Sequence, residues 1–295
     1  MRRSIGSARY APYLFVLPFI VSFLAFYFYP LVSTVIMSFQ EIIPGKTHFI
    51  GVLNYKKLIN PYMLVAIWNS FRYTALTIAI LIPVPILFAV LLNNPRNPAN
   101  SVFRAALFIP TLVSVVVAGT LIRILFAASP EAIINRVLLP LGVQAKDWLV
   151  GNSRQSMFLL VTMATWRWTG VNIIYFLSGL QNIPRDLYEA ANIDGASAWY
   201  RFFRITLPLL RPTIIFVTTI SVFGGFAMFE ESYILWQGNS PNNVGLTMVG
   251  YIYLKGFQGG AMGLGSAIGM ILLLIVLAVS ILQLNFFGFF RKEEA

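Results

Sequence analysis

Six long apolar runs divide this chain, and they constrain its fold more than any other feature of the sequence. A helix needs about 20 mostly apolar residues to cross a bilayer, and each run reaches that length. The runs cover roughly residues 13–39, 63–92, 103–128, 157–180, 209–233 and 261–290. A spanning backbone must satisfy its own hydrogen bonds. We therefore expect an all-α, polytopic membrane protein with six transmembrane helices in a single domain, residues 1–295.

The composition excludes several classes of function. Hydrophobic residues make up 58% of the chain and charged residues 11%, whereas a soluble domain carries about 25% charge. Cysteine is absent and His48 is the only histidine, so we expect no disulfide, no metal site and no cysteine nucleophile. The net charge of +11 is scattered between the apolar runs. It therefore fits membrane topology better than a nucleic-acid partner.

Basic residues predict the orientation, because cytoplasmic loops are enriched in Lys and Arg. With the N-terminus inside, the inner segments hold Arg2, Arg3, Arg9, Arg96, Arg104, Arg185, Arg201, Arg204, Arg211, Arg291 and Lys292. The outer loops then hold Lys46, Lys56, Lys57, Arg136, Lys146, Arg154 and Lys255. Since the inner segments carry the larger number, we expect both termini inside. The first run is too long for a signal-peptide core and lacks a cleavage site behind it, so we expect it to be retained.

A polar island, residues 184–208, separates the fourth and fifth runs on the inner side. Pro184 suits a first helical position. Leu187, Tyr188 and Ala191 then form one apolar stripe, from which Glu189 points away. A plain alternative is an amphipathic connector that rests on the lipid headgroups.

The second half of the island predicts another short helix at an angle to the first. Asp194 is placed to cap a helix over residues 195–204. Gly195 permits a sharp bend or a close backbone approach. Pro208 then ends the unit where the next apolar run begins.

The spacing within the island matches a known family motif. Glu189-Ala190-Ala191 is followed by Gly195 and, nine residues later, by Ile205, Leu207 and Pro208. This register resembles the inner-loop motif of ABC importer permeases. Ile193-Asp194-Gly195-Ala196 has the form found in carbohydrate permeases.

The resemblance extends over nearly the whole chain. Tyr29-Pro30-Leu31, Ile109-Pro110 and Leu180-Gln181 are similar to segments of sugar permeases of the maltose-transporter type. Residues 240–247 look closest to the arabinose/multiple-sugar branch. Arg123 departs from the pattern, since many relatives carry tryptophan there.

The resemblance implies a type I ABC importer permease fold and a heteromeric complex. The expected partners are a second homologous permease, two ATPase subunits that hold ATP and Mg, an extracytoplasmic sugar-binding protein, a carbohydrate substrate and the bilayer. Residues 184–208 would be the cytoplasmic ATPase-docking helices. The docking residues implied are Glu189, Ala190, Ala191, Asp194, Gly195, Ile205, Leu207 and Pro208. The membrane would be the plasma membrane of a prokaryote, with both termini cytoplasmic.

This chain contains no G-x-x-x-x-G-K-[ST] phosphate loop. We therefore expect a transport subunit with no cofactor and no ATPase site of its own, and thus no enzyme.

The fourth run carries candidate sugar contacts, because polar groups within a membrane usually serve function. Trp168, Asn172 and Tyr175 share one helical face beside Arg167. Aromatic rings and hydrogen-bonding groups suit the apolar faces and hydroxyls of a sugar. The alternative is that Trp166 and Trp168 form an interfacial belt and Arg167 snorkels to water.

The fifth run adds further candidates. They are Gly225, Phe226, Phe229, Glu230 and Tyr233. Phe226, Phe229 and Tyr233 follow i, i+3, i+7 spacing, which predicts that they line one helical face. Glu230 and Glu231 bind sugar hydroxyls in this hypothesis, or instead mark the outer interface in water.

Other functions stay as alternatives. An intramembrane enzyme would need a nucleophile, base or metal cluster, and the spans hold no G-x-S-x-G or H-E-x-x-H motif. An ion-coupled transporter usually needs buried acids or broken helices at the midplane, whereas the acids here lie in loops or near span ends. An importer of the same class for a non-sugar solute remains open, as do the roles of Arg72 and Arg123.

Overall fold

The computed structural model describes residues 5–43, 45–93, 97–238 and 240–288, with side chains from Tyr10 onward. The chain forms two compact units, one of Met1–Asn60 with Tyr251–Leu273 and one of Pro61–Gly250 with Leu274–Ala295. Some sequence predictions concern positions outside the described residues. These positions are Arg2, Arg3, Arg96, Phe290, Arg291 and Lys292, together with the side chain of Arg9.

The first unit begins with a long apolar helix. It consists of α1 (Ile5–Phe23), a π-helical turn (Leu24–Phe28) and α2 (Tyr29–Ser38). An antiparallel hairpin of β1 (Gln40–Ile43) and β2 (Lys46–Phe49) and the short helix α3 (Leu53–Lys57) follow. A π-helical segment (Tyr253–Gln258) and the start of α16 (Met262–Phe286) complete the unit.

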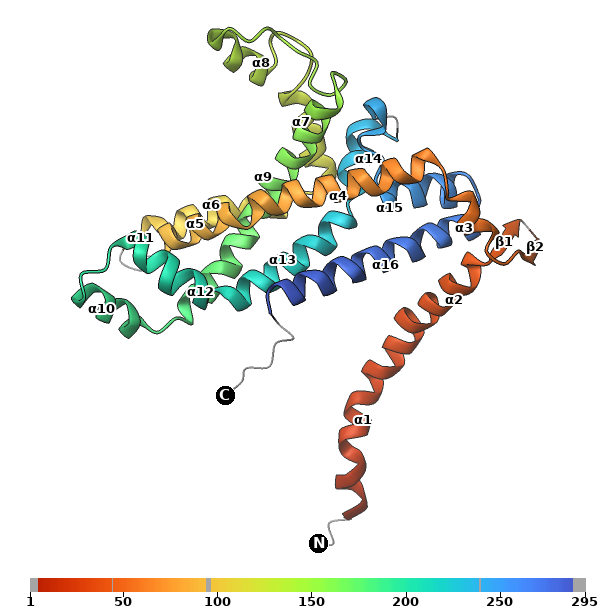
Figure 1. Ribbon diagram of the computed structural model, residues 1–295, viewed down its shortest axis with the longest axis horizontal. Coiled ribbons are helices and arrows are strands. Elements are labelled where there is room, and N and C mark those ends of the chain that lie inside the picture. Colours follow the sequence, from red (N-terminus) through yellow and green to blue (C-terminus); the bar gives the residue numbers. More distant parts are fainter. Residues whose placement is uncertain (1–4, 44, 94–96, 239, 289–295) are drawn as a thin grey trace. The chain divides into compact units, whose positions relative to one another are not determined.

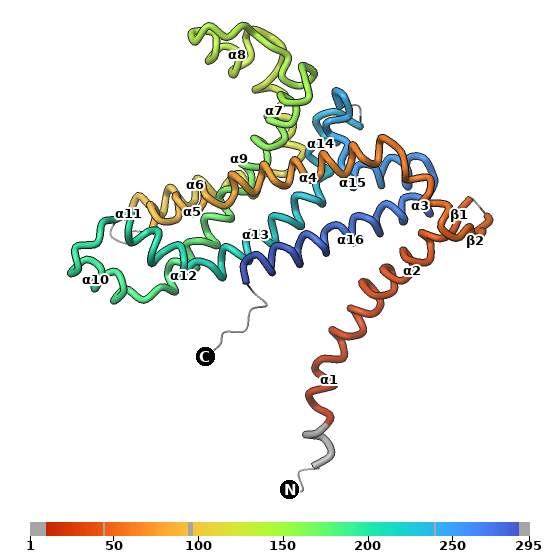
Figure 2. Tube along the Cα trace, viewed as in Figure 1, coloured from red at the N-terminus to blue at the C-terminus, as the bar shows by residue number. Residues whose placement is uncertain are grey.

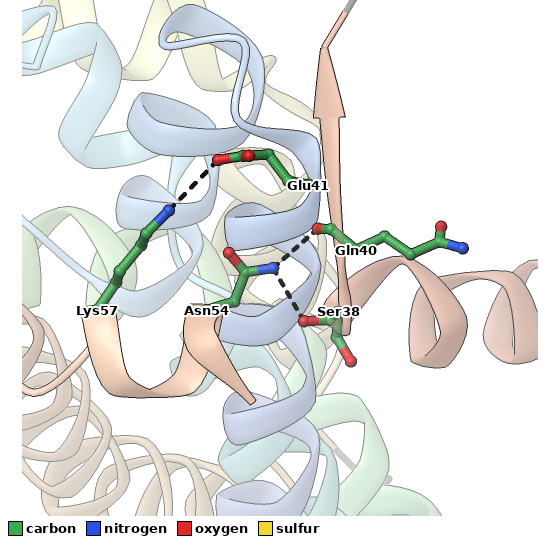
Figure 3. Close-up of polar contacts among 5 residues, drawn as sticks. All are labelled: Ser38, Gln40, Glu41, Asn54 and Lys57. Carbon is green, nitrogen blue, oxygen red and sulfur yellow. Dashed lines mark hydrogen bonds and ion pairs between the residues drawn. The ribbon is translucent and has the colours of Figure 1, made fainter. Parts of the chain in front are cut away.

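Asn54 holds the corner between α2, the hairpin and α3 (Figure 3). Its side-chain amide donates to the carbonyls of Ser38 and Gln40 at 3.0 and 2.9 Å, which satisfies backbone groups at the end of the helix. Gly263 of α16 lies against the same strand, because an added Cβ would collide with the carbonyl oxygen of Gln40. Gly265 similarly meets Gly256. The small residues of the last run therefore serve helix packing here.

The second unit contains the remaining α-helices, except that α15 ends just inside the first unit, and it also holds the end of α16 (Figure 1). They are α4 (Pro61–Leu81), α5 (Pro83–Leu92), α6 (Ala99–Leu112), α7 (Val115–Leu125), α8 (Ile133–Leu138), α9 (Ser153–Gln181), α10 (Arg185–Ile193), α11 (Ala198–Arg201), α12 (Leu207–Leu209), α13 (Arg211–Phe226), α14 (Glu230–Trp236) and α15 (Met248–Ile252). Helix α9 contacts α4, α5, α6 and α13. Its buried side chains, among them Leu160, Met163 and Phe176, form much of the core.

Four helices among the described residues are long and apolar enough to cross a membrane. They are Tyr10–Ser38, Pro61–Leu92, Arg211–Trp236 and Met262–Phe286, and they correspond to the first, second, fifth and sixth predicted runs. The fourth run lies in α9, whose 29 residues extend over about 43 Å at 1.5 Å per residue. Helix α9 is therefore long enough to cross a membrane, but its sequence is more polar than those of the four helices named above.

The third run is not the single straight helix that the sequence predicts. Helices α6 and α7 meet at an angle of 99° (Figure 2). Val113 and Ser114 are extended, and the Ser114 hydroxyl accepts a hydrogen bond from the Val117 amide at 3.3 Å, which starts the new helix. The two halves together are long and apolar enough for a fifth, broken span.

The fifth run is also interrupted. Helix α13 ends at Phe226, and α14 begins at Glu230. The hydroxyl of Thr247 donates to the carbonyl of Met228 within this break at 2.6 Å. A side chain therefore satisfies a backbone carbonyl that lies outside the helices, as a non-helical backbone at membrane depth requires.

Candidate functional site

The polar island folds into two short helices joined by a tight bend. In Figure 1 it leaves the end of α9 as α10 and returns through α11 and α12 to α13. Gly195 adopts φ +72° directly after α10. The Ala196 amide bonds to the Ala191 carbonyl at 2.9 Å, and the Gly195 amide bonds to the Asn192 carbonyl at 3.1 Å. This is a Schellman C-cap, which requires a left-handed residue and so favours glycine.

Two details of the predicted island are wrong. Pro184 is the N-cap residue of α10 and not its first helical residue. Asp194 is the C-cap residue of α10 and does not cap the second helix. After the bend at Gly195, the chain needs extended residues before it can turn again. The second helix therefore starts only at Ala198, where the Ser197 hydroxyl accepts from the Tyr200 amide at 3.2 Å.

We expect Gly195→Ala to lower the free energy of unfolding by about 1 kcal/mol, because an L side chain disfavours the left-handed region. An added Cβ would meet no atom within 4 Å, so the effect is conformational and not steric. Thermal unfolding of the purified protein measures it. Gly224→Ala is the matched control, since that helical glycine has a negative φ and equally open surroundings. Equal melting temperatures for the two variants would contradict the explanation.

The island is fixed to the core through one face of α10. Tyr188 hydrogen-bonds to the buried Thr206 hydroxyl at 2.9 Å, which ties α10 to the segment that leads into α13. Tyr188 also packs against the core cluster that holds Leu180 and Leu210. Ala191 is buried and Glu189 is exposed, as the stripe predicts, whereas Leu187 is 43% exposed.

Large apolar side chains of the island remain uncovered within this chain. Ile193 is 87% exposed and Trp199 70% exposed. The ring of Trp199 stacks on that of Phe203, which is also exposed, at a centroid distance of 6.0 Å. Of the other predicted docking residues, Ile205 and Leu207 are partly buried and Pro208 is exposed. The segment thus combines charged side chains with an apolar surface that no other part of the described chain covers.

The second candidate site is a cavity of about 410 Å³ between α4, α9, α13 and α14. Its volume lies within the range of small-molecule sites. The predicted substrate residues that line it are Trp168, Asn172, Tyr175, Gly225, Phe229 and Glu230. The spacing of the first three, i, i+4 and i+7, thus does place them on one shared wall.

Three predicted substrate residues do not line the cavity. Phe226 is buried and packs edge-on against Phe71, with ring centroids 4.9 Å apart. The ring of Tyr233 packs against that of Phe229, at a centroid distance of 5.3 Å. Arg167 is turned toward Glu231. Phe226 belongs to α13 and is held by Phe71, whereas Tyr233 lies one turn beyond Phe229 in α14, so neither ring is part of the lining.

Sequence reasoning missed the contribution of α4. Tyr73 and Thr77 of this helix line the cavity. Together with Asn69 they form a row at i, i+4 and i+8 on one face of a run that also holds Ser70, Arg72 and Thr74. That spacing is a helical-face signal that was present in the sequence.

Arg167 and Glu231 form an ion pair at the cavity. The Arg167 guanidinium lies 3.0 Å from the Glu231 carboxylate, and both side chains are only 12% exposed. The guanidinium also lies over the Trp168 ring, 5.4 Å from its centroid. The alternatives of a snorkelling Arg167 and of Glu231 at the outer water interface are therefore wrong. Arg123, in contrast, is exposed in the last turn of α7.

Asn172 has a structural role in addition to its place on the cavity wall. Its side-chain nitrogen donates to the Leu81 carbonyl at 3.0 Å. The helical partner of that carbonyl would be the amide of residue 85, but Pro85 has no N–H. Asn172 therefore satisfies a carbonyl that the proline leaves unpaired.

Replacing Asn172 by Leu should lower the free energy of unfolding by about 1–3 kcal/mol, the cost of an unsatisfied buried carbonyl. Thermal or denaturant unfolding of the purified protein measures this. Thr120→Val is a suitable control, because the Thr120 hydroxyl bonds only to the carbonyl one turn earlier and is exposed. A loss no larger than that of the control would rule out the role given to Asn172.

The sequence of this chain is similar to those of a known protein family. Residues 81–290 match the family described as "Binding-protein-dependent transport system inner membrane component". The chain is 50% identical, over 97% of its own length and 91% of the relative, to the arabinooligosaccharides transport system permease protein AraP of Bacillus subtilis. It is 32% identical, over 92% of both chains, to the lactose transport system permease protein LacF of Rhizobium radiobacter.

Solved structures share the fold. One is a chain of a bacterial ABC transporter involved in the import of the acidic polysaccharide alginate, with a TM-score of 0.84 and 24% identity over 97% of this chain and 98% of the other. Another is a chain of the bacterial alginate ABC transporter in complex with alginate pentasaccharide-bound periplasmic protein. Its TM-score is 0.85, with 23% identity over 99% of both chains.

Proposed function

Because this chain belongs to the family of binding-protein-dependent transport system inner membrane components, we propose that it is the permease subunit of an ATP-driven carbohydrate importer. The description of the family supports a location in the membrane and transport that depends on a binding protein. The relative that is 50% identical is a permease for arabinooligosaccharides, which supports a carbohydrate as the cargo.

The importer contains more subunits than this chain. A second, similar permease completes the membrane pathway, and two ATPases hold ATP and Mg, since this sequence has no phosphate-binding loop of its own. An external binding protein delivers the sugar. The fold is similar to that of a transporter chain solved together with an oligosaccharide-bound periplasmic protein, which supports this arrangement.

Residues 184–208 dock on the ATPases. Glu189 supplies an exposed charge, while Ile193, Trp199 and Phe203 supply an apolar surface that would otherwise face water. A cleft in a partner subunit removes that surface from water and so stabilises the complex. The Schellman cap and the Tyr188–Thr206 hydrogen bond keep the segment rigid.

One observation carries the mechanism: the island directly connects α9 and α13, two of the helices whose side chains line the cavity. Helix α10 follows the end of α9, and α12 leads into α13. ATP binding closes the ATPases, which displaces α10, and this displacement changes the relative position of the two cavity helices. The sugar site then opens to one side of the membrane and closes to the other.

The cavity holds the sugar in this mechanism. The rings of Trp168, Tyr175 and Phe229 offer flat apolar faces for its C–H groups, and Thr77 and Glu230 offer hydrogen-bonding groups. The termini and the docking segment lie on the cytoplasmic side, as the distribution of Lys and Arg predicts.

Reconstitution tests this function. The permease pair, the ATPases and the binding protein are incorporated into proteoliposomes, and uptake of an arabinooligosaccharide is followed with and without ATP. We expect uptake that requires both ATP and the binding protein. Uptake that persists without ATP but collapses on addition of an uncoupler would instead indicate an ion-coupled transporter.

A further inference from the structure

The charged groups that line the 410 Å³ cavity are all acidic. Its ionisable lining residues are Tyr73, Tyr175, Glu230 and Glu231, and the lining contains no Lys, Arg or His. Glu231 is paired with Arg167 at 3.0 Å, which neutralises its charge. Among the described residues no basic side chain forms an ion pair with Glu230. The wall therefore carries one negative charge that no cation offsets.

The surroundings strengthen the effect of this charge. Most of the wall is aromatic or aliphatic, so the local dielectric is lower than in water and charges interact more strongly. A cleft with low-dielectric walls and one sign of charge concentrates the field within it. Glu230 is itself exposed to the cavity, so a solute that enters comes within its field.

We propose that Glu230 is a charge-selectivity residue, which lets the cavity accept neutral oligosaccharides and disfavour sugars that carry a carboxylate. This inference rests on the proposed function of the cavity as the sugar site. A neutral sugar donates its hydroxyl protons to the Glu230 carboxylate in charge-assisted hydrogen bonds. A uronic or aldonic acid instead places a like charge beside it, which is unfavourable.

The fold itself does not dictate this selectivity. The similar solved chains belong to importers of alginate, an acidic polysaccharide, but they share only 24% and 23% of their residues with this chain. A likeness at that identity shows the fold alone, so the charge of the cavity wall is taken from the residues of this chain. Glu230 thus distinguishes the cargo of this chain by charge, within a common fold.

Charged thiol reagents measure the field in the cavity directly. The chain contains no cysteine, so Ser221→Cys places a single thiol on the cavity wall. In the assembled complex, we compare its modification rates with a cationic and an anionic methanethiosulfonate. Both reagents react with the same thiolate, so their rate ratio reports the local potential and not the thiol's reactivity.

We expect Glu230→Gln to lower the ratio of cationic to anionic rates by about fivefold or more, as loss of a potential of roughly one kT or more requires. Glu230→Asp, which keeps the charge, should keep the ratio. Glu131→Gln, which removes an exposed carboxylate outside the cavity, should also leave it unchanged. In uptake experiments, Glu230→Gln should raise the entry of an oligosaccharide aldonate relative to its neutral parent.

A ratio that Glu230→Gln leaves unchanged would overturn the inference. So would a thiol that neither reagent modifies, because the cavity would then be closed to solutes. The reagent rates do not depend on transport. A changed ratio in a complex that shows no ATP-driven sugar uptake would therefore refute the proposed function alone.

Discussion

Glu189→Lys is expected to abolish sugar uptake and sugar-stimulated ATP hydrolysis, with a loss of at least roughly a hundredfold, as for a reversed charge at the centre of an interface. Glu189 is exposed on α10, and its side chain points away from the face that Tyr188 and Ala191 attach to the core. The substitution should therefore leave folding and membrane insertion nearly unchanged, as surface substitutions usually do. Uptake and ATP hydrolysis in proteoliposomes measure the effect.

The matched control for this variant makes the same charge change elsewhere. Glu131→Lys reverses an exposed carboxylate in the loop before α8, which we place on the other side of the membrane. It should retain uptake. Full uptake by the Glu189→Lys complex would contradict the docking role of α10. Loss of uptake in both variants would show that reversing any exposed carboxylate impairs the complex, whatever its position.

Breaking the ion pair between Arg167 and Glu231 is expected to have the largest effect on stability. Both side chains are 12% exposed, and removing one partner leaves the other charge buried and unpaired. Such a loss costs about 3–5 kcal/mol. Glu231→Gln and Arg167→Met should each therefore lower the melting temperature of the purified complex strongly, while the double variant should recover much of the loss.

An exposed pair in the same chain provides the comparison. Lys57 and Glu41 lie 3.5 Å apart, with side chains 46% and 45% exposed. Glu41→Gln should cost no more than about 1 kcal/mol, since surface ion pairs contribute little. If the two single variants of the buried pair are simply additive in the double variant, the pairing has no energetic role.

The spacing of apolar and polar residues predicted much of this structure. The six runs predicted where the long helices occur, because burial in lipid demands apolar side chains over a fixed length. The i, i+4, i+7 spacing likewise placed Trp168, Asn172 and Tyr175 on one wall. The Gly195 bend was also predictable, because only glycine adopts a positive φ at little cost.

The remaining features depend on information that local patterns do not contain. The breaks at Val113–Ser114 and at Ala227–Phe229 occur within continuous apolar sequence, so hydropathy does not reveal them. Phe226 packs against Phe71 and Tyr233 against Phe229, and the spacing along the chain does not reveal that neither ring lines the cavity. Arg167 and Glu231 are far apart in the sequence, and only the packing of α9 against α14 brings their charges together.

Accessibility of the docking segment is the most direct test of the account. A thiol introduced by Ile193→Cys, at a side chain that is 87% exposed in this chain, can be labelled with a membrane-impermeant maleimide. We predict labelling from the cytoplasmic side in the permease alone, and strong protection once the ATPases are bound. Labelling from the outside, or equal labelling with and without the ATPases, would contradict the claim that this segment couples the permease to its motor.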